Sequence, residues 1–168
     1  MAAAAIIIRH PTPADEAEFI EKARRSRALH RPWMKAPTTS ALFRGLLDDA
    51  RDERRRVWLV CLRGSGEIAG VVNVSEIVRG SFRSAYLGYY AFAGFERRGL
   101  MRQGLKAVVR HAFHVERLHR LEANIQPANR ASLALAKSCG FAKEGYSRRY
   151  LKISGRWRDH ERWAIVAS

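Results

Sequence analysis

A short basic turn, residues 96–102 (ERRGLMR), constrains this chain more than any other feature of the sequence. It follows an aromatic, strand-like run at residues 86–92 (YLGYYAF), and apolar residues then recur at helical spacing over residues 101–115. A helix that begins after a strand and a glycine turn leaves its first backbone N–H groups unpaired, and its dipole adds positive charge there. Such a turn suits a pyrophosphate group, although alone it also fits a plain strand-to-helix connection.

A second segment, about thirty residues further along the chain, carries its own helix signals. Asn129 suits an N-cap position, Ser132 falls in the first turn of a helix expected over residues 130–138, and Gly140 ends that helix before Phe141. The two segments at this spacing are more specific together than either is alone.

Together they resemble the signatures of the GCN5-related N-acetyltransferase (GNAT) family, whose cosubstrate is acetyl-coenzyme A. The family motif is usually Gln or Arg, two variable residues, Gly, one variable residue, then Gly or Ala. Here Gly99 is kept, but Glu96 and Met101 replace the first and last positions; we expect the Met101 N–H still to donate and its side chain to enter the core. The resemblance implies that acetyl-CoA contacts Tyr90, Ala91, Phe92, Arg97, Arg98, Gly99, Leu100, Met101, Arg102, Asn129 and Ser132.

Further segments resemble the bacterial RimJ branch of this family, which acetylates the N-terminal alanine of a small-subunit ribosomal protein. The likeness covers about residues 57–163 and rests on residues 73–75, 78–82, 86–89, 118–124, 144–146 and 155–160. Earlier residues match less clearly, and in the family they include two helices that shape the acceptor site. The resemblance implies a protein N-terminal α-amine as acceptor. A small amine (a polyamine, an amino acid or an aminoglycoside) and a non-catalytic ribosome- or RNA-binding module are the alternatives.

The chemistry requires groups that move protons, because an amine is protonated at neutral pH and cannot attack a thioester until a proton leaves. Glu122 is the first candidate base, since it shares with Asn124 the strand face that points toward the cleft in related enzymes. A salt bridge from Glu122 to a nearby arginine is the alternative, and Tyr86 and Tyr146 are other proton carriers or wall residues. By resemblance, Ser132 protonates the departing thiolate; the alternative is an ordinary first-turn serine.

Periodicity and turn residues predict alternating strands and helices within a single domain, residues 1–168. We expect strands at 6–8, 57–62, 68–78, 82–92 and 121–125, two more around Gly155, and helices at about 13–26, 39–51, 99–116 and 130–138. The expected fold is therefore mixed α/β (α+β-like), a GNAT fold with a central, mostly antiparallel sheet of about seven strands and helices on both faces. Trp33 and Met34 either line a substrate mouth or pack the first two helices together.

Charge points to a further partner. Thirty-one Lys and Arg against sixteen Asp and Glu give a formal net charge of +15. Arginine's planar fork suits phosphate, so the excess favours association with a ribosome or rRNA. A coding bias that spreads arginine over the surface is the alternative.

Composition also bounds the compartment. Cys61 and Cys139 stand in apolar contexts at no redox or metal spacing, so we expect buried free thiols. His111 and His114 share a helix face but lack a third ligand, and we expect no metal. The first eight residues lack the basic start of a signal peptide and no apolar run is long enough to span a membrane, so we expect a cytoplasmic protein without a membrane partner.

Overall fold

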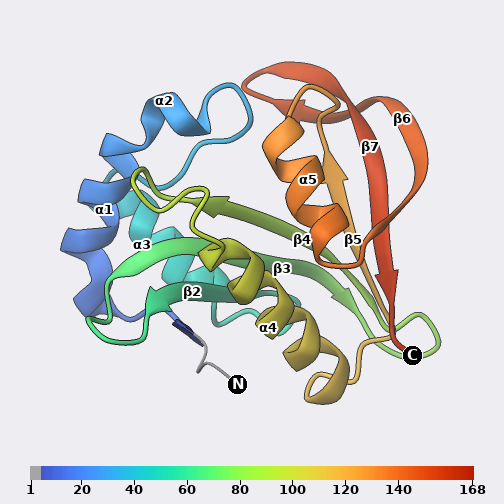
Figure 1. The fold of residues 1–168 in the computed structure, drawn as a ribbon, viewed down its shortest axis with the longest axis horizontal. Coiled ribbons are helices and arrows are strands. Elements are labelled where there is room, and N and C mark those ends of the chain that lie inside the picture. The colour runs from blue at the N-terminus through green and yellow to red at the C-terminus, as the bar shows by residue number, and fades with distance from the viewer. Residues whose placement is uncertain (1–4) are drawn as a thin grey trace.

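The computed structural model describes residues 5–168, which contain a seven-stranded sheet (Figure 1). β4 and β5 run parallel, and every other neighbouring pair is antiparallel, which confirms the predicted mixed, mostly antiparallel sheet. In sheet order the strands are β1 (Ile6–Arg9), β2 (Arg56–Leu62), β3 (Ile68–Val78), β4 (Ser84–Ala91), β5 (Arg120–Ile125), β7 (Arg156–Val166) and β6 (Ala142–Ile153).

Helices cover both faces of the sheet, as predicted. They are α1 (Glu16–Arg25), α2 (Arg27–His30), α3 (Ser40–Asp49), α4 (Leu100–His114) and α5 (Arg130–Ser138), with a 3-10 turn η1 (Pro13–Asp15) before α1. Successive residues of a strand point to opposite faces. In β4, Tyr89 contacts Ser132 of α5, whereas Tyr90 contacts His30 of α2. α4 packs beside α5, so α4 and α5 share one face and α2 lies on the other (Figure 1).

Local side-chain bonds set the helix boundaries. The Thr39 hydroxyl accepts a hydrogen bond from the Leu42 N–H at the start of α3, and Asn129 Oδ1 accepts one from the Ser132 N–H at the start of α5. The expected helix over residues 13–26 ends where predicted, since Ser26 is the C-cap of α1, but residues 13–15 form the 3-10 turn η1 and the separate short helix α2 follows. The buried Ser26 hydroxyl donates to the Lys22 carbonyl and accepts from the Ala93 N–H, which competes with regular helical bonding.

The core lies on both faces of the sheet, between α4 and the central strands on one face and beneath Phe19 of α1 and Phe43 of α3 on the other. Leu59 and Val60 of β2 and Leu105 and Val108 of α4 are fully buried, and each such side chain contributes about 1.5–3 kcal/mol. α4 approaches β2 closely because Gly104 has no side chain; an added Cβ would lie 2.5 Å from a methyl carbon of Val60.

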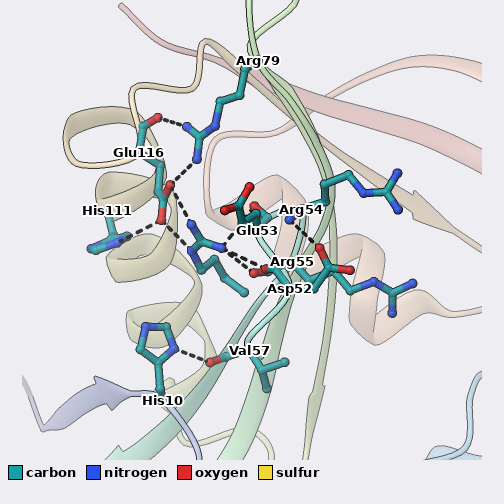
Figure 2. A network of polar contacts seen from close by, with 10 residues as sticks. His10, Asp52, Glu53, Arg54, Arg55, Val57, Arg79, His111 and Glu116 are labelled. Carbon is teal, nitrogen blue, oxygen red and sulfur yellow. Dashed lines mark hydrogen bonds and ion pairs between the residues drawn. The ribbon is translucent and has the colours of Figure 1, made fainter. Parts of the chain in front are cut away.

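A paired polar cluster lies beyond the C-terminal end of α4 (Figure 2). We call it the Glu116 hub. The Glu116 carboxylate is 2.7 Å from Arg56 Nε and 2.6 Å from an Arg79 nitrogen. Burial alone would raise the pKa of Glu116, but hydrogen bonds from the two arginines outweigh it and hold that pKa below its usual value. The hub fastens the start of β2 and the β3–β4 loop to the end of α4.

The structure also bears on the cysteines, on membrane spans and on metal ligands. Cys61 and Cys139 are both buried and free, as predicted. Within residues 5–168, no helix is long and apolar enough to cross a membrane. No group of three or more possible metal ligands is found in that same part of the chain.

Candidate active site

The gap between β4 and β5 is the central feature of the site. The two parallel strands pair only from Ser84 and Arg120 to Leu87 and Ala123. Beyond that point both strands continue without pairing to each other, and a cavity of about 230 Å³ lies beside the gap. Its lining includes Trp33 and, from the predicted set, Tyr90, Asn124, Asn129 and Ser132. A larger, open hollow of about 700 Å³ over α1 contains none of the predicted site residues.

One wall of the cavity is formed by α5 and the side chain of Tyr89. The Ser132 hydroxyl donates to the Tyr89 hydroxyl at 3.1 Å, and the Tyr89 hydroxyl donates to the Ser132 carbonyl at 3.0 Å. Burial raises the pKa of Tyr89 to about 12, so its phenol stays protonated at neutral pH. Ser132 is therefore fixed at the cavity by two contacts to one half-buried tyrosine.

The opposite wall carries amide groups from two strands. Asn73 of β3 pairs with Gly88, and Asn124 of β5 pairs with Arg162 of β7. Both asparagines line the cavity, and the Oδ1 atom of each is buried with no donor among residues 5–168. Unpaired buried acceptors cost free energy, so a bound molecule that brings N–H groups would offset that cost.

The remaining proton-transfer candidates lie outside the cavity lining. Glu122 accepts a 2.8 Å hydrogen bond from Arg120, which also pairs with Glu144, so the salt bridge considered for Glu122 is present. The Tyr146 hydroxyl donates to Asp159 at 2.7 Å. Tyr86 lies on the same sheet face as Glu122, its register partner. Asn124 and Ser132 thus both line the cavity, whereas Glu122, two residues before Asn124 on β5, does not.

The predicted pyrophosphate turn has an open geometry. Gly99 is the N-cap of α4 with φ of +72°, a left-handed conformation that favours glycine, and nothing lies within 4 Å of an added Cβ. The first helical bond runs from the Gln103 N–H to the Gly99 carbonyl. The N–H groups of the three preceding residues are therefore free of helical partners. Exposed arginines surround the turn at positions 97, 98 and 102.

The two departures from the family motif are both accommodated. The Glu96 carboxylate turns back and accepts a 2.7 Å hydrogen bond from the Gly94 N–H. Met101 is buried, as predicted, and its sulfur occupies space left by Gly70 of β3, where an added Cβ would lie 2.4 Å away. The backbone of the turn is thus open to a ligand, and a group with phosphates fits these residues.

The sequence predicts that residues 90–92, at the end of β4, belong to the site, but it does not predict which side chain fixes their backbone. His30 of α2 is buried, and its Nε2–H donates to the Ala91 carbonyl at 2.8 Å. Burial lowers the pKa of His30, which keeps the imidazole neutral. His30, Asn73 and His160 all lie around the site and were absent from the predicted set. Asn73 is a polar residue in an apolar stretch, and residues 73–75 and 155–160 belong to the segments that resemble the RimJ branch, whereas the sequence around His30 carries no comparable signal.

Residues 5–142 match the acetyltransferase (GNAT) domain family, so the chain belongs to that family. It is 46% identical over 100 residues to [ribosomal protein uS5]-alanine N-acetyltransferase of Escherichia coli, covering 60% of this chain and 52% of that protein. The chain thus spans about half the length of the curated relatives it matches.

Solved structures agree with this assignment. Mycobacterium smegmatis RimJ, solved in complex with CoA-disulfide, matches with a TM-score of 0.85 and 28% identity over 96% of this chain and 82% of that one. Spermidine N-acetyltransferase from Vibrio cholerae matches with a TM-score of 0.81 and 22% identity over 98% and 96%, a likeness of fold alone. The predicted family and fold class are confirmed, while the roles of individual site residues stay predictions.

Proposed function

We propose that this protein transfers the acetyl group of acetyl-CoA to the N-terminal α-amine of a protein, with the alanine of a ribosomal protein as acceptor. The observation that carries the proposal is the cavity beside the β4–β5 gap, because β4 leads from it directly into the Gly99 turn. The similarity to the E. coli alanine N-acetyltransferase and to RimJ supports the same assignment. We place the reaction in the cytoplasm.

The Gly99 turn and the end of β4 would hold acetyl-CoA. Backbone N–H groups of Leu100, Met101 and Arg102 would bind the pyrophosphate, and the exposed arginines of the turn add charge. When bound, acetyl-CoA supplies a thioester carbonyl activated toward amines. Asn129 lies where the pantetheine arm would pass, and the backbone of Tyr90, Ala91 and Phe92 would flank the reacting end.

Ser132 and Asn124 act at the reacting atoms. Asn124 Oδ1 receives no hydrogen bond from residues 5–168, and an amine brings N–H groups that Oδ1 could accept, which would orient the amine for attack. The Ser132 hydroxyl would give its proton to the departing sulfur. Replacement of Ser132 by Ala should lower kcat about 100-fold, the lower range for a general acid, with acetyl-CoA affinity unchanged. Isothermal titration and steady-state kinetics would check this.

The cavity disfavours a polycationic acceptor. None of the described residues that line it is Asp or Glu, so no carboxylate is placed to bind a second or third ammonium group. Its lining reaches the α2–α3 loop through Trp33 and the β6–β7 hairpin through Leu151. Exposed cations in these two segments, at positions 31, 35, 148, 149, 152, 156 and 158, would repel a polyamine.

The same cations support docking on the ribosome. The β6–β7 hairpin, which contributes Leu151 and Ile153 to the cavity, combines exposed basic residues with Trp157, which is 60% exposed. A basic, aromatic surface fits RNA phosphates and unstacked bases. Association with ribosomes should weaken steeply as salt rises, whereas association that is insensitive to salt would contradict electrostatic docking.

Thiol release from acetyl-CoA across a panel of amines tests the proposed function. The panel contains short peptides that begin with Ala, Ser or Met, together with spermidine, free amino acids and an aminoglycoside. We expect turnover on Ala-peptides with a free α-amine and none on N-acetylated controls. Turnover restricted to small amines would show that the acceptor is a small amine and not a protein N-terminus. Acetyl-CoA binding without any turnover would favour a non-catalytic binding module.

A further inference from the structure

The base that deprotonates the acceptor amine has to reach the cavity, and few groups there can accept a proton. Among the described residues that line the cavity, the ionisable ones are Tyr89, Tyr90 and His160. Burial raises the pKa of both tyrosines, so each remains protonated at neutral pH. A protonated phenol cannot act as a base, which leaves the imidazole.

His160 has a defined tautomer. Its side chain is buried, at 2% exposure, and its Nδ1 atom lies 2.9 Å from the Arg158 carbonyl oxygen. A carbonyl oxygen only accepts hydrogen bonds, so Nδ1 carries the proton and Nε2 carries the lone pair. None of residues 5–168 forms a hydrogen bond with Nε2, which leaves that atom available to a ligand.

The register of β7 places His160 on the acceptor side of the gap. Arg162 pairs with Asn124 of β5, and His160 lies two residues further along, on the same face and just past the last residue of β5. Its register partner on β6 is Ser147. Ser132 belongs to α5 on the other face of the sheet. A base and an acid therefore face the gap from its two sides.

We propose that His160 is the general base of this active site. This proposal rests on the acetyltransferase function proposed above. His160 Nε2 takes a proton from the ammonium group of the acceptor, and the neutral amine then adds to the thioester carbonyl. As the C–S bond breaks, Ser132 gives its proton to sulfur and regains one from solvent, while the second proton on nitrogen and the imidazolium proton pass to solvent. Glu122, held by Arg120 outside the cavity lining, is the competing base.

Matched variants separate the two bases. His160→Gln keeps similar volume and polarity, and Glu122→Gln serves as the comparison. With an Ala-peptide at pH 7, we expect H160Q to lower kcat about 100-fold, with little change in KM or in acetyl-CoA affinity. E122Q should stay within a few-fold of the parent. The H160Q defect should shrink as the pH rises past about 8, where the α-amine is already neutral.

Chemical rescue keeps the test independent of folding. Free imidazole should restore part of the activity of His160→Ala but not of Ser132→Ala, because only the former lacks a base. H160Q activity within threefold of the parent at pH 7, a defect that does not change with pH, or loss confined to E122Q would overturn the proposal. A parent protein that binds acetyl-CoA yet acetylates no amine would instead refute the proposed function.

Discussion

The charged side chains at the two ends of α4 differ in whether they are paired within the protein. At the C-terminal end, the partial negative charge of the helix dipole is joined by the Glu116 carboxylate, and Arg56 and Arg79 neutralise it within the protein (Figure 2). At the N-terminal end, where the dipole is positive, the first turn has no acid and exposed arginines follow one another at positions 97, 98 and 102. None of these three arginines pairs with a carboxylate in residues 5–168.

This contrast favours the N-terminal end of α4 as the end that binds a ligand. A charge that opposes the dipole is tolerated at the hub because its partners are built into β2 and the β3–β4 loop. At the Gly99 turn, no carboxylate among residues 5–168 pairs with the three arginines, which supports the proposal that a phosphate group binds there. We therefore expect one end of α4 to contribute to the stability of the fold and the other end to contribute to binding. Variants at each end should separate these two quantities.

The largest expected effect is on stability, at the hub. Replacement of Glu116 by Ala leaves Arg56, a partly buried guanidinium, without its carboxylate. We expect the free energy of unfolding to fall by about 2–3 kcal/mol, since a hydrogen-bonded charge loses its partner. Acetyl-CoA affinity at low temperature should not change. Urea denaturation and calorimetric titration measure the two quantities.

Glu53→Ala is the matched control for the hub, because Glu53 is exposed and contributes only its backbone carbonyl to Arg56. It should leave stability within about 0.5 kcal/mol of the parent. If E116A bound acetyl-CoA more weakly without being less stable, the assignment of separate roles to the two ends would fail.

The next effect is on binding, at the turn. Valine at Gly99 has to adopt φ of +72°, where a β-branched side chain costs about 1–2 kcal/mol. The turn should relax and misdirect its N–H groups, so acetyl-CoA affinity should fall about tenfold. Gly64→Val is the control, since Gly64 lies in the β2–β3 turn without a positive φ and with nothing within 4 Å of an added Cβ. Equal affinity of G99V and the parent would remove the turn from the binding site.

The arginines should affect binding and stability in opposite directions. Replacement of Arg98 and Arg102 by Gln removes cations from the positive end of α4. Each charge near a helix end is worth about 0.3–1 kcal/mol, so stability should rise slightly. Acetyl-CoA affinity should fall about two- to fivefold per arginine, and its dependence on salt should weaken. Arg110→Gln, at an exposed mid-helix position, should change neither quantity.

The sequence predicts what depends on neighbours in the chain. The Gly99 turn, the Asn129 cap and the bounds of α5 are local, and each is written in a few consecutive residues. The cavity is different, because Asn73, Asn124 and His160 meet only through strand register across β3, β5 and β7. Register between distant strands leaves no local pattern, so the helix-based half of the site could be predicted and much of the strand-based half could not. Glu122 and Asn124 illustrate this, since two residues on one strand face differ in whether they reach the cavity.

The smallest expected effect is on the pH dependence of stability, which should differ between His30, near the site, and the Glu116 hub. Burial lowers the pKa of His30, near the strand end at the site, below its ordinary value of 6.5. The unfolded chain therefore binds more protons than the folded one in that range, and stability is lost as the pH falls below about 6.5. The pKa of Glu116 is lowered below 4.5, so the stabilisation by the hub is present above that pH and lost below it.

His30→Gln should keep a donor for the Ala91 carbonyl while removing the titration. We expect the loss of stability between about pH 6.5 and 5 to become smaller by up to about 1 kcal/mol. It should not vanish, because burial also lowers the pKa of His111. Glu116→Gln should instead flatten the curve below pH 4.5. Urea denaturation at each pH measures both slopes. If H30Q altered only the slope below pH 4.5, the loss of stability assigned to His30 would belong to a carboxylate. His30 and the Glu116 hub would then not titrate separately.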